Sequence, residues 1–293
     1  MYYKHLKTRS FKKKLKKQNI TSTDLISFLQ IVYSTTAFST FPYLINRKNS
    51  KQALKRNCGN CVSLSLAVQK LLKKEKKVIS YLIPATIPKH IYRPGYLEIS
   101  HVALAIPYSK NGIFIVDPAF YFLEPIDIDI RNLPHNNDPI IKSKIFSQTI
   151  THINSHINIL DKKVILNKFQ TIPAKTLVCT CIDDDNEPWS YFLTEVLNPD
   201  EAISTFFINI RKEPFITTTE VDDEGICQQN IDLRVKDKDT VAISLKNNKI
   251  YDGLISDISQ DVGDILDEEL GQHFDGEILP YLTAPVKGPY NFK

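Results

Sequence analysis

The stretch NCGNCVSLSLAVQKLL at residues 57–72 joins a turn of asparagine and glycine to an apolar run. Asparagine and glycine favour turns, and asparagine is a good helix N-cap, so the sequence predicts a helix capped by Asn60 with Cys61 at its start. Backbone N–H groups there would point at the sulfur and at an oxyanion forming beside it. Taken alone, a cysteine in this position is more often a small buried side chain, so a nucleophilic role for Cys61 depends on partners elsewhere.

Two candidate partners follow in strand-like sequence. In EISHVALAIP, residues 98–107, alternation places His101 on the same strand face as two alanines, which leave room beside it. In GIFIVDPAF, residues 112–120, Asp117 ends an apolar strand, where a buried carboxylate needs a partner. Each residue alone also fits a core histidine or a strand-ending aspartate. Together, Cys61, His101 and Asp117 form a candidate catalytic triad, because a histidine oriented by a carboxylate activates a thiol.

The pairing of these two strands can take two registers. In the first register His101 is directly opposite Asp117, and residues 107–111 form a five-residue loop. In the second register a tight Asn-Gly turn closes the hairpin and leaves His101 opposite Phe122, too far from Asp117. Only the first register supports the triad.

The spacing of apolar residues and the positions of Pro, Gly and Asn divide the chain into three regions. Residues 1–77 hold a basic arm and helical patterns, which predict a small helical bundle carrying the nucleophile. Residues 78–188 hold short β-branched runs separated by Pro, Gly and Asn, which predict strands carrying the histidine and the aspartate. Residues 189–293 combine helical and hairpin patterns. An α+β fold is the economical interpretation.

Composition predicts a globular protein that works inside the cell. The 293 residues include 42% hydrophobic residues, enough to bury a large core. No stretch reaches the roughly 18 apolar residues of a membrane span, and the N-terminus has no apolar core of the kind found in secretory signals. Five cysteines, an odd number on a long chain, favour free thiols over a disulfide framework. We therefore expect a cytoplasmic location.

The net charge of +4 is concentrated in the N-terminal arm. Residues 1–17 contain eight Lys or Arg and no acidic residue, which leaves 29 basic and 33 acidic side chains in the remainder. Such a run is usually a solvated helix face or a tail, and contact with an anionic surface is the alternative. We infer no nucleic-acid function from it.

Two cysteine pairs raise the question of a metal. Cys58 and Cys61 form C-x-x-C, and Cys179 and Cys181 form C-x-C, so the pairs could be halves of a zinc site or the first pair a regulatory disulfide. The spacing is irregular and the second pair sits in an apolar strand, so we expect no metal.

The order Cys61, His101, Asp117 and the sequences around these residues resemble the arylamine N-acetyltransferase family. In that family the cysteine follows a glycine-containing turn, the histidine lies in H-x-x-L-x-V, and the aspartate lies in V-D-x-x-F; GNCVSLSLAV, HVALAI and VDPAF look similar. FPYLI at 41–45 and the segment from 191 to 220 extend the resemblance over most of the chain. The family's Arg-Gly-Gly is replaced by RNCGN at 56–60, and its acidic residue near the cysteine by serines.

The resemblance implies a cysteine-proteinase-like α+β fold with an N-terminal helical bundle, a central antiparallel β-barrel and a C-terminal α/β lid. It also implies ping-pong acyl transfer, in which Cys61 takes an acetyl or other acyl group from a coenzyme A thioester and passes it to an amine acceptor. Acetyl-CoA or another acyl-CoA would be the co-substrate. Transglutaminase-like hydrolases and deamidases share the Cys-His-Asp order, so hydrolysis is one alternative, and an inactive binding or structural protein on the same fold is another.

Overall fold

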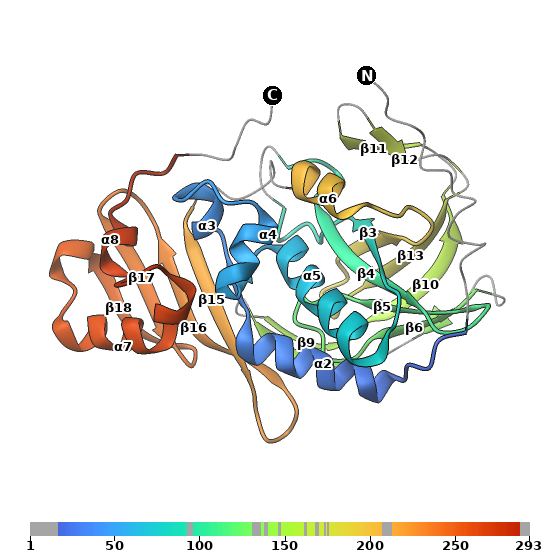
Figure 1. Cartoon of the computed structure of the whole chain (residues 1–293), viewed down its shortest axis with the longest axis horizontal. Helices are drawn as coiled ribbons and strands as arrows, with labels where there is room; N and C mark the ends of the chain where they lie inside the picture. The colour runs from blue at the N-terminus through green and yellow to red at the C-terminus, as the bar shows by residue number, and fades with distance from the viewer. Residues whose placement is uncertain are drawn as a thin grey trace.

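Two β-sheets lie side by side, and helices from the N-terminal third of the chain pack between them (Figure 1). The computed structural model describes residues 17–92, 96–130, 136–137, 140–145, 148–160, 163–167, 170–172, 174, 176–206 and 213–287. The basic arm, apart from Lys17, lies outside the described residues, and so does its predicted contact with an anionic surface. Within the described part of the chain, no helix combines the length and the apolar character that a membrane span requires.

The N-terminal helices supply the nucleophile and the layer behind it. Thr21 caps the first long helix in a capping box with Asp24. The apolar side chains of this helix and of the helix that begins at Cys61 face a common core. The helical elements are α2 (Ser22–Thr35), α3 (Phe41–Leu44), α4 (Ser50–Ala53), η1 (Leu54–Arg56), α5 (Cys61–Leu71) and η2 (Leu72–Lys76).

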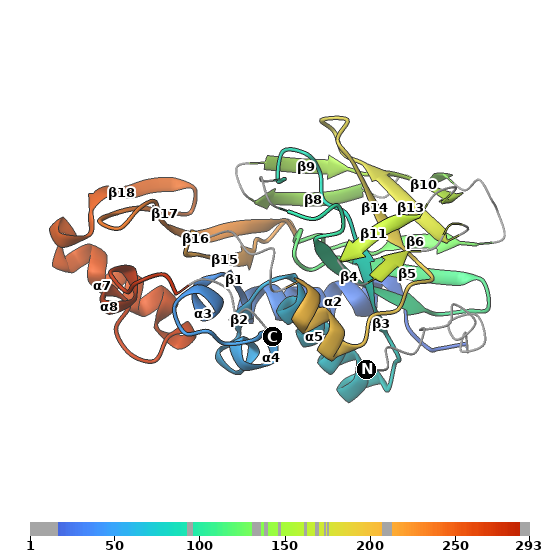
Figure 2. The same ribbon diagram turned by 90° about the horizontal axis from the view of Figure 1, so that it is seen from above.

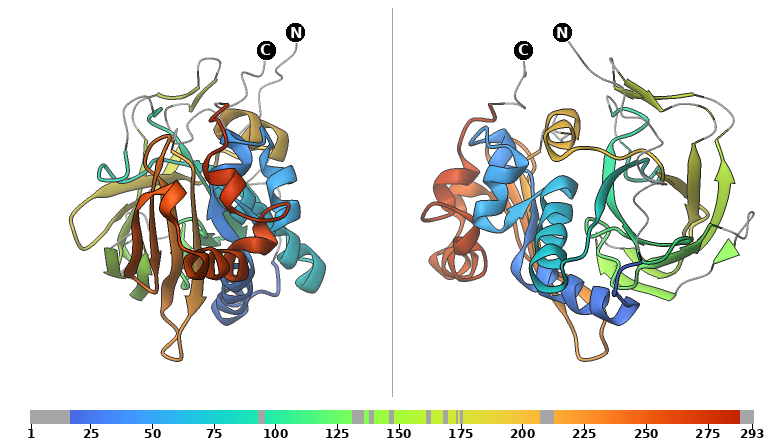
Figure 3. Two further views of the ribbon diagram at one scale, coloured as in Figure 1. Left: turned by 90° about the vertical axis from the view of Figure 1, so that its left-hand side faces the viewer. Right: turned by 45° about the vertical axis from the view of Figure 1, so that its right-hand side comes forward.

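The central strands form an antiparallel sheet that nearly closes into a barrel (Figures 2 and 3). Its order is β6-β5-β4-β3-β14-β13-β10-β7, and the end strands β6 and β7 contact each other. The predicted α+β fold with a central antiparallel barrel is therefore confirmed. The strands are β3 (Tyr81–Ala85), β4 (His101–Pro107), β5 (Gly112–Val116), β6 (Ile126–Asp129), β7 (Asn136–Asn137), β10 (Asn154–Ile159), β13 (Leu177–Ile182) and β14 (Pro188–Phe192); β11 (Val164–Asn167) and β12 (Gln170–Ile172) form a separate hairpin.

The second sheet joins strands from both ends of the chain. Its order is β18-β17-β16-β15-β1-β2, with β8 paired to β16 and β9 to β8. Helices α7 and α8 cover one face of it (Figure 1). Its strands are β1 (Ala37–Ser39), β2 (Cys58–Gly59), β8 (Ile140–Ile145), β9 (Gln148–His152), β15 (Phe215–Val221), β16 (Cys227–Val235), β17 (Thr240–Leu245) and β18 (Asn248–Leu254); the helices of this part are α6 (Pro199–Phe206), η3 (Ile255–Asp257), α7 (Gln260–Leu270), η4 (Gly271–His273) and α8 (Leu279–Leu282).

The strands of the second sheet come from more than one of the three predicted regions of the chain. Strands β1 and β2 come from the predicted helical region, yet they complete a sheet built mostly from residues after 213. The division of the chain at residues 77 and 188, and a lid function for the C-terminal part, stay predictions.

Strand alternation separates two apolar cores at the barrel. On β4, Ala103 and Ala105 belong to the core inside the barrel, whereas Val102, Leu104 and Ile106 belong to the core between the barrel and the helices. This division is the one that the sequence of β4 predicts. Because His101 shares the face of the two alanines, its side chain belongs to the barrel interior.

Candidate active site

Cys61 is the first residue of helix α5, as predicted, and Asn60 is its N-cap. The Asn60 side-chain oxygen accepts the backbone N–H groups of Val62 (3.1 Å) and Ser63 (3.3 Å). The cap therefore occupies two of the N–H groups at the start of the helix, and the orientation of backbone N–H groups towards the sulfur stays a prediction. The backbone N–H of Cys61 itself is the donor that the Asn60 side chain does not use.

Neither predicted register of the hairpin is correct. Leu104 pairs with Val116 and Pro107 with Ile113, so Asp117 falls level with Ala103 rather than with His101. This register differs from the triad-compatible prediction by two residues along the strand. An even shift keeps every side chain on its face, so His101 and Asp117 become diagonal neighbours on the interior face.

The structure brings His101 and Asp117 into direct contact. His101 Nε2 lies 2.7 Å from Asp117 Oδ2, and the two residues are 4% and 2% exposed. Burial by itself lowers the pKa of His101, but the charge and hydrogen bond of Asp117, with a smaller contribution from the Cys61 side chain, raise it to about 10. His101 is therefore an imidazolium at neutral pH, held between a carboxylate and the thiol of Cys61, which is 7% exposed.

Tyr191 is a further member of the site that the sequence did not reveal. Its hydroxyl donates to Asp117 Oδ2 at 2.7 Å. Strand pairing explains how it arrives there, since Tyr191 pairs with Ala85 and Ala85 pairs with His101, which places all three in one row across the barrel. The other carboxylate oxygen, Oδ1, is buried and has no hydrogen-bond partner among the described residues.

Phe120 is a second residue that sequence reasoning missed. Its ring stacks on the imidazole of His101 at 4.6 Å between centroids and meets Trp189 edge to face. The ring therefore limits rotation of the histidine and shields it from water. The sequence feature that could have identified Phe120 is its position three residues after Asp117, in VDPAF.

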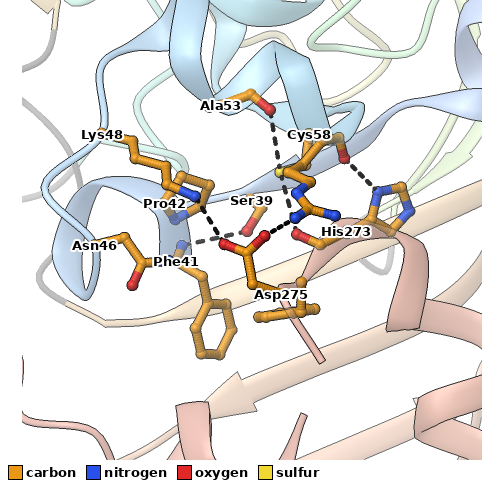
Figure 4. Close-up of a pocket in the computed structure, with 11 residues that line it drawn as sticks. Ser39, Phe41, Pro42, Asn46, Lys48, Ala53, Cys58, His273 and Asp275 are labelled. Atoms are coloured by element: carbon orange, nitrogen blue, oxygen red, sulfur yellow. Dashed lines mark hydrogen bonds and ion pairs between the residues drawn. The ribbon is translucent and has the colours of Figure 1, made fainter. Parts of the chain in front are cut away.

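Cys58 lies apart from the triad candidates, in a small pocket beside the C-terminal segment (Figure 4). Burial raises the pKa of the Cys58 thiol to about 12. It packs in the core of the second sheet, whereas Cys179 and Cys181 lie inside the barrel. Across the part of the chain that the structure describes, no three His, Cys, Asp or Glu side chains cluster closely enough to hold a metal ion.

Comparison with solved structures finds arylamine N-acetyltransferases. The Bacillus cereus enzyme, with a Cys-His-Glu catalytic triad, is 14% identical, and the match covers 89% of this chain and 96% of that chain with a TM-score of 0.52. The Mycobacterium marinum enzyme is 13% identical, and the match covers 95% of this chain and 97% of that chain with a TM-score of 0.54. The M. smegmatis enzyme is 12% identical, and the match covers 93% of this chain and 94% of that chain with a TM-score of 0.55. No protein-family model and no curated protein sequence matches the chain. At these identities the likeness establishes a shared fold.

Proposed function

We propose that this protein is an acyltransferase that moves an acetyl or related acyl group from a coenzyme A thioester to an amine through Cys61. The observation that carries the proposal is the buried His101, which bonds Asp117 at 2.7 Å and interacts with Cys61 at the start of α5. The fold shared with arylamine N-acetyltransferases supports the choice of acyl transfer and of these substrate classes.

In the first half-reaction the Cys61 thiolate attacks the thioester carbonyl carbon. A bond forms from Cys61 sulfur to that carbon, and the bond from carbon to the coenzyme A sulfur breaks. The departing coenzyme A thiolate takes a proton from His101, whose second ring nitrogen, Nδ1, is the one not engaged by Asp117. The Cys61 backbone N–H is the candidate donor to the intermediate oxyanion.

In the second half-reaction an amine attacks the acyl group on Cys61. His101, now neutral, takes the amine proton as the carbon–nitrogen bond forms, and the Cys61 thiolate leaves as the carbon–sulfur bond breaks. The imidazolium and the thiolate are restored. Asp117 keeps its hydrogen bond to His101 throughout, because its role is to orient the ring and stabilise its charge.

Burial of the three side chains favours transfer over hydrolysis. Cys61, His101 and Asp117 are each less than one-tenth exposed, and Phe120 covers one face of the imidazole. Water therefore has little access to an acyl group on Cys61, and a bound amine can compete for it.

The test follows coenzyme A release from acetyl-CoA with and without aniline as the acceptor. We expect aniline to accelerate release and acetanilide to form in equal amount, with both lost in Cys61→Ala and kept in the matched variant Cys58→Ala. Release that aniline does not accelerate would contradict transfer and favour the hydrolase alternative. No release with any acyl-CoA would contradict the acyl-CoA proposal.

A further inference from the structure

The nucleophile helix begins on a buried polar cluster that the proposed mechanism leaves without a role. The cluster consists of the side chains of Tyr43, Ser50, Asn60 and Ser63, and is called the Tyr43 cluster below. All four residues are buried and come from α3, α4 and the start of α5. Buried polar groups cost free energy unless they are paired. The hydrogen bonds of the cluster therefore indicate which part of the backbone the cluster supports.

The hydrogen bonds of the Tyr43 cluster form a closed ring. Each hydroxyl has one proton to donate. Ser63 Oγ donates to the Ser50 carbonyl oxygen (3.0 Å), and Ser50 Oγ donates to Asn60 Oδ1 (3.1 Å). The Tyr43 hydroxyl accepts the Asn60 backbone N–H at 2.9 Å. Its own proton lies within hydrogen-bond distance of Ser63 Oγ (2.9 Å), Asn60 Oδ1 (3.0 Å) and Ser50 Oγ (3.2 Å). The ring therefore includes the residue that precedes Cys61.

Gly59 shows how tightly the turn rests on this ring. Its φ of +145° is one that glycine adopts readily, and a Cβ atom would lie 2.1 Å from Ser63 Oγ and 2.7 Å from the Tyr43 hydroxyl oxygen. No space separates the turn from the Tyr43 cluster. The Tyr43 cluster therefore directly supports the backbone that leads into Cys61.

We infer that Tyr43 is a positioning residue for Cys61, acting through the Asn60 backbone to hold the thiol against His101. The inference rests on the proposed role of Cys61 as the nucleophile. Tyr43 makes this contribution through hydrogen bonds alone, since burial raises the pKa of its phenol and keeps it neutral.

The test replaces Tyr43 by phenylalanine and measures alkylation of Cys61 by iodoacetamide, read by peptide mass. Alkylation needs no acyl donor, so the result is independent of whether acetyl-CoA is the substrate. We expect the second-order rate constant at pH 7 to fall by about tenfold to a hundredfold, because a misplacement of about 1 Å can slow a reaction about a hundredfold. The rate should also rise more steeply with pH, because a thiol displaced from His101 must lose its proton to solvent. A purely structural role would leave that pH dependence unchanged.

Tyr33→Phe is the matched control. Tyr33 is also fully buried, and its hydroxyl donates to the Phe122 carbonyl oxygen at 2.6 Å, away from the turn. This variant should lose stability and keep the wild-type rate and pH dependence. If Tyr43→Phe does not fold, Ser63→Ala opens the same ring and should slow alkylation likewise.

Three results would overturn the inference. One is wild-type alkylation in folded Tyr43→Phe or Ser63→Ala, and another is equal slowing in Tyr33→Phe. The third is wild-type Cys61 that iodoacetamide does not modify, which would also contradict the proposed nucleophile.

Discussion

At the scale of single residues, the pair formed by His101 and Asp117 makes stability depend on pH. The pKa of His101 rises from its ordinary value of 6.5 to about 10 on folding, because Asp117 outweighs the burial that lowers it. Because the pKa of His101 is higher in the folded protein than in the unfolded chain, protonation of His101 stabilises the fold. This stabilisation is complete below pH 6.5 and is lost as the pH rises to about 10.

The corresponding variant is His101→Gln, which cannot carry the charge. The free energy of unfolding of the wild type should exceed that of the variant most near pH 6.5. The difference should shrink by a few kcal/mol towards pH 10, at about 1.4 kcal/mol for each pKa unit. Urea titrations of both proteins across this range give the difference directly. A difference that does not change with pH would contradict the pairing.

Tyr191 allows a test at the same scale. Tyr191→Phe removes the hydroxyl that donates to Asp117 Oδ2 and leaves the carboxylate with His101 as its partner. We expect single-turnover acetylation of Cys61 to slow by about tenfold, since a hydrogen bond to a charged group contributes about 1.5–3 kcal/mol. Tyr108→Phe is the control, because that hydroxyl donates to exposed Asp127 at 2.7 Å. Equal rates in both variants would argue against a role for Tyr191.

At the scale of elements, the start of α5 was predictable because its determinants are local. Asn60 caps the helix and the apolar period begins beside it, so the signal lies within a few residues. The hairpin register was not predictable in this way. The Ser109 hydroxyl accepts the backbone N–H groups of Asn111 and Gly112, and the Tyr108 ring packs on Phe114. These contacts stabilise a turn that differs from both the predicted five-residue loop and the predicted tight Asn-Gly turn.

The cap of α5 should contribute more than an ordinary cap. Asn60→Ala removes the acceptor for two backbone N–H groups and for the hydroxyl of Ser50 in a buried setting. We expect a loss of about 2 kcal/mol or more in the free energy of unfolding. Asn49→Ala removes the cap of α4 at a half-buried position and should cost about 1 kcal/mol. Urea unfolding of both variants checks the order, and an equal loss would contradict it.

At the scale of the whole molecule, the arrangement depends on contacts between distant segments that no local pattern signals. Tyr191 reaches Asp117 across 74 residues of sequence. Strands β1 and β2 join the sheet formed by β15–β18. Alternation along the strands predicted that His101 and Asp117 share a face, and the family resemblance predicted the barrel. The contact of Tyr191 with the carboxylate depends on which strands become neighbours, which the local sequence does not signal.

Asp275 joins the C-terminal segment to the region before Cys61. It pairs with Lys48 at 3.1 Å (Figure 4) and also with Arg56. These side chains are partly exposed, so the pairs should contribute about 1 kcal/mol or less together. Asp275→Ala should lower the melting temperature by about 1–4 °C at low ionic strength and much less in 1 M NaCl. Asp200→Ala, in the more exposed pair with Lys51, is the control and should change little. A loss that salt does not reduce would contradict an ionic tie.

The most direct test of the central claim is intact-mass spectrometry after brief incubation with acetyl-CoA. Wild-type protein and Cys58→Ala should each gain the mass of one acetyl group, and Cys61→Ala should gain none. Addition of aniline should then remove the acetyl group from the acylated proteins. An acetyl group that persists in Cys61→Ala, or its absence from wild-type protein whose Cys61 still reacts with iodoacetamide, would contradict acyl transfer through Cys61.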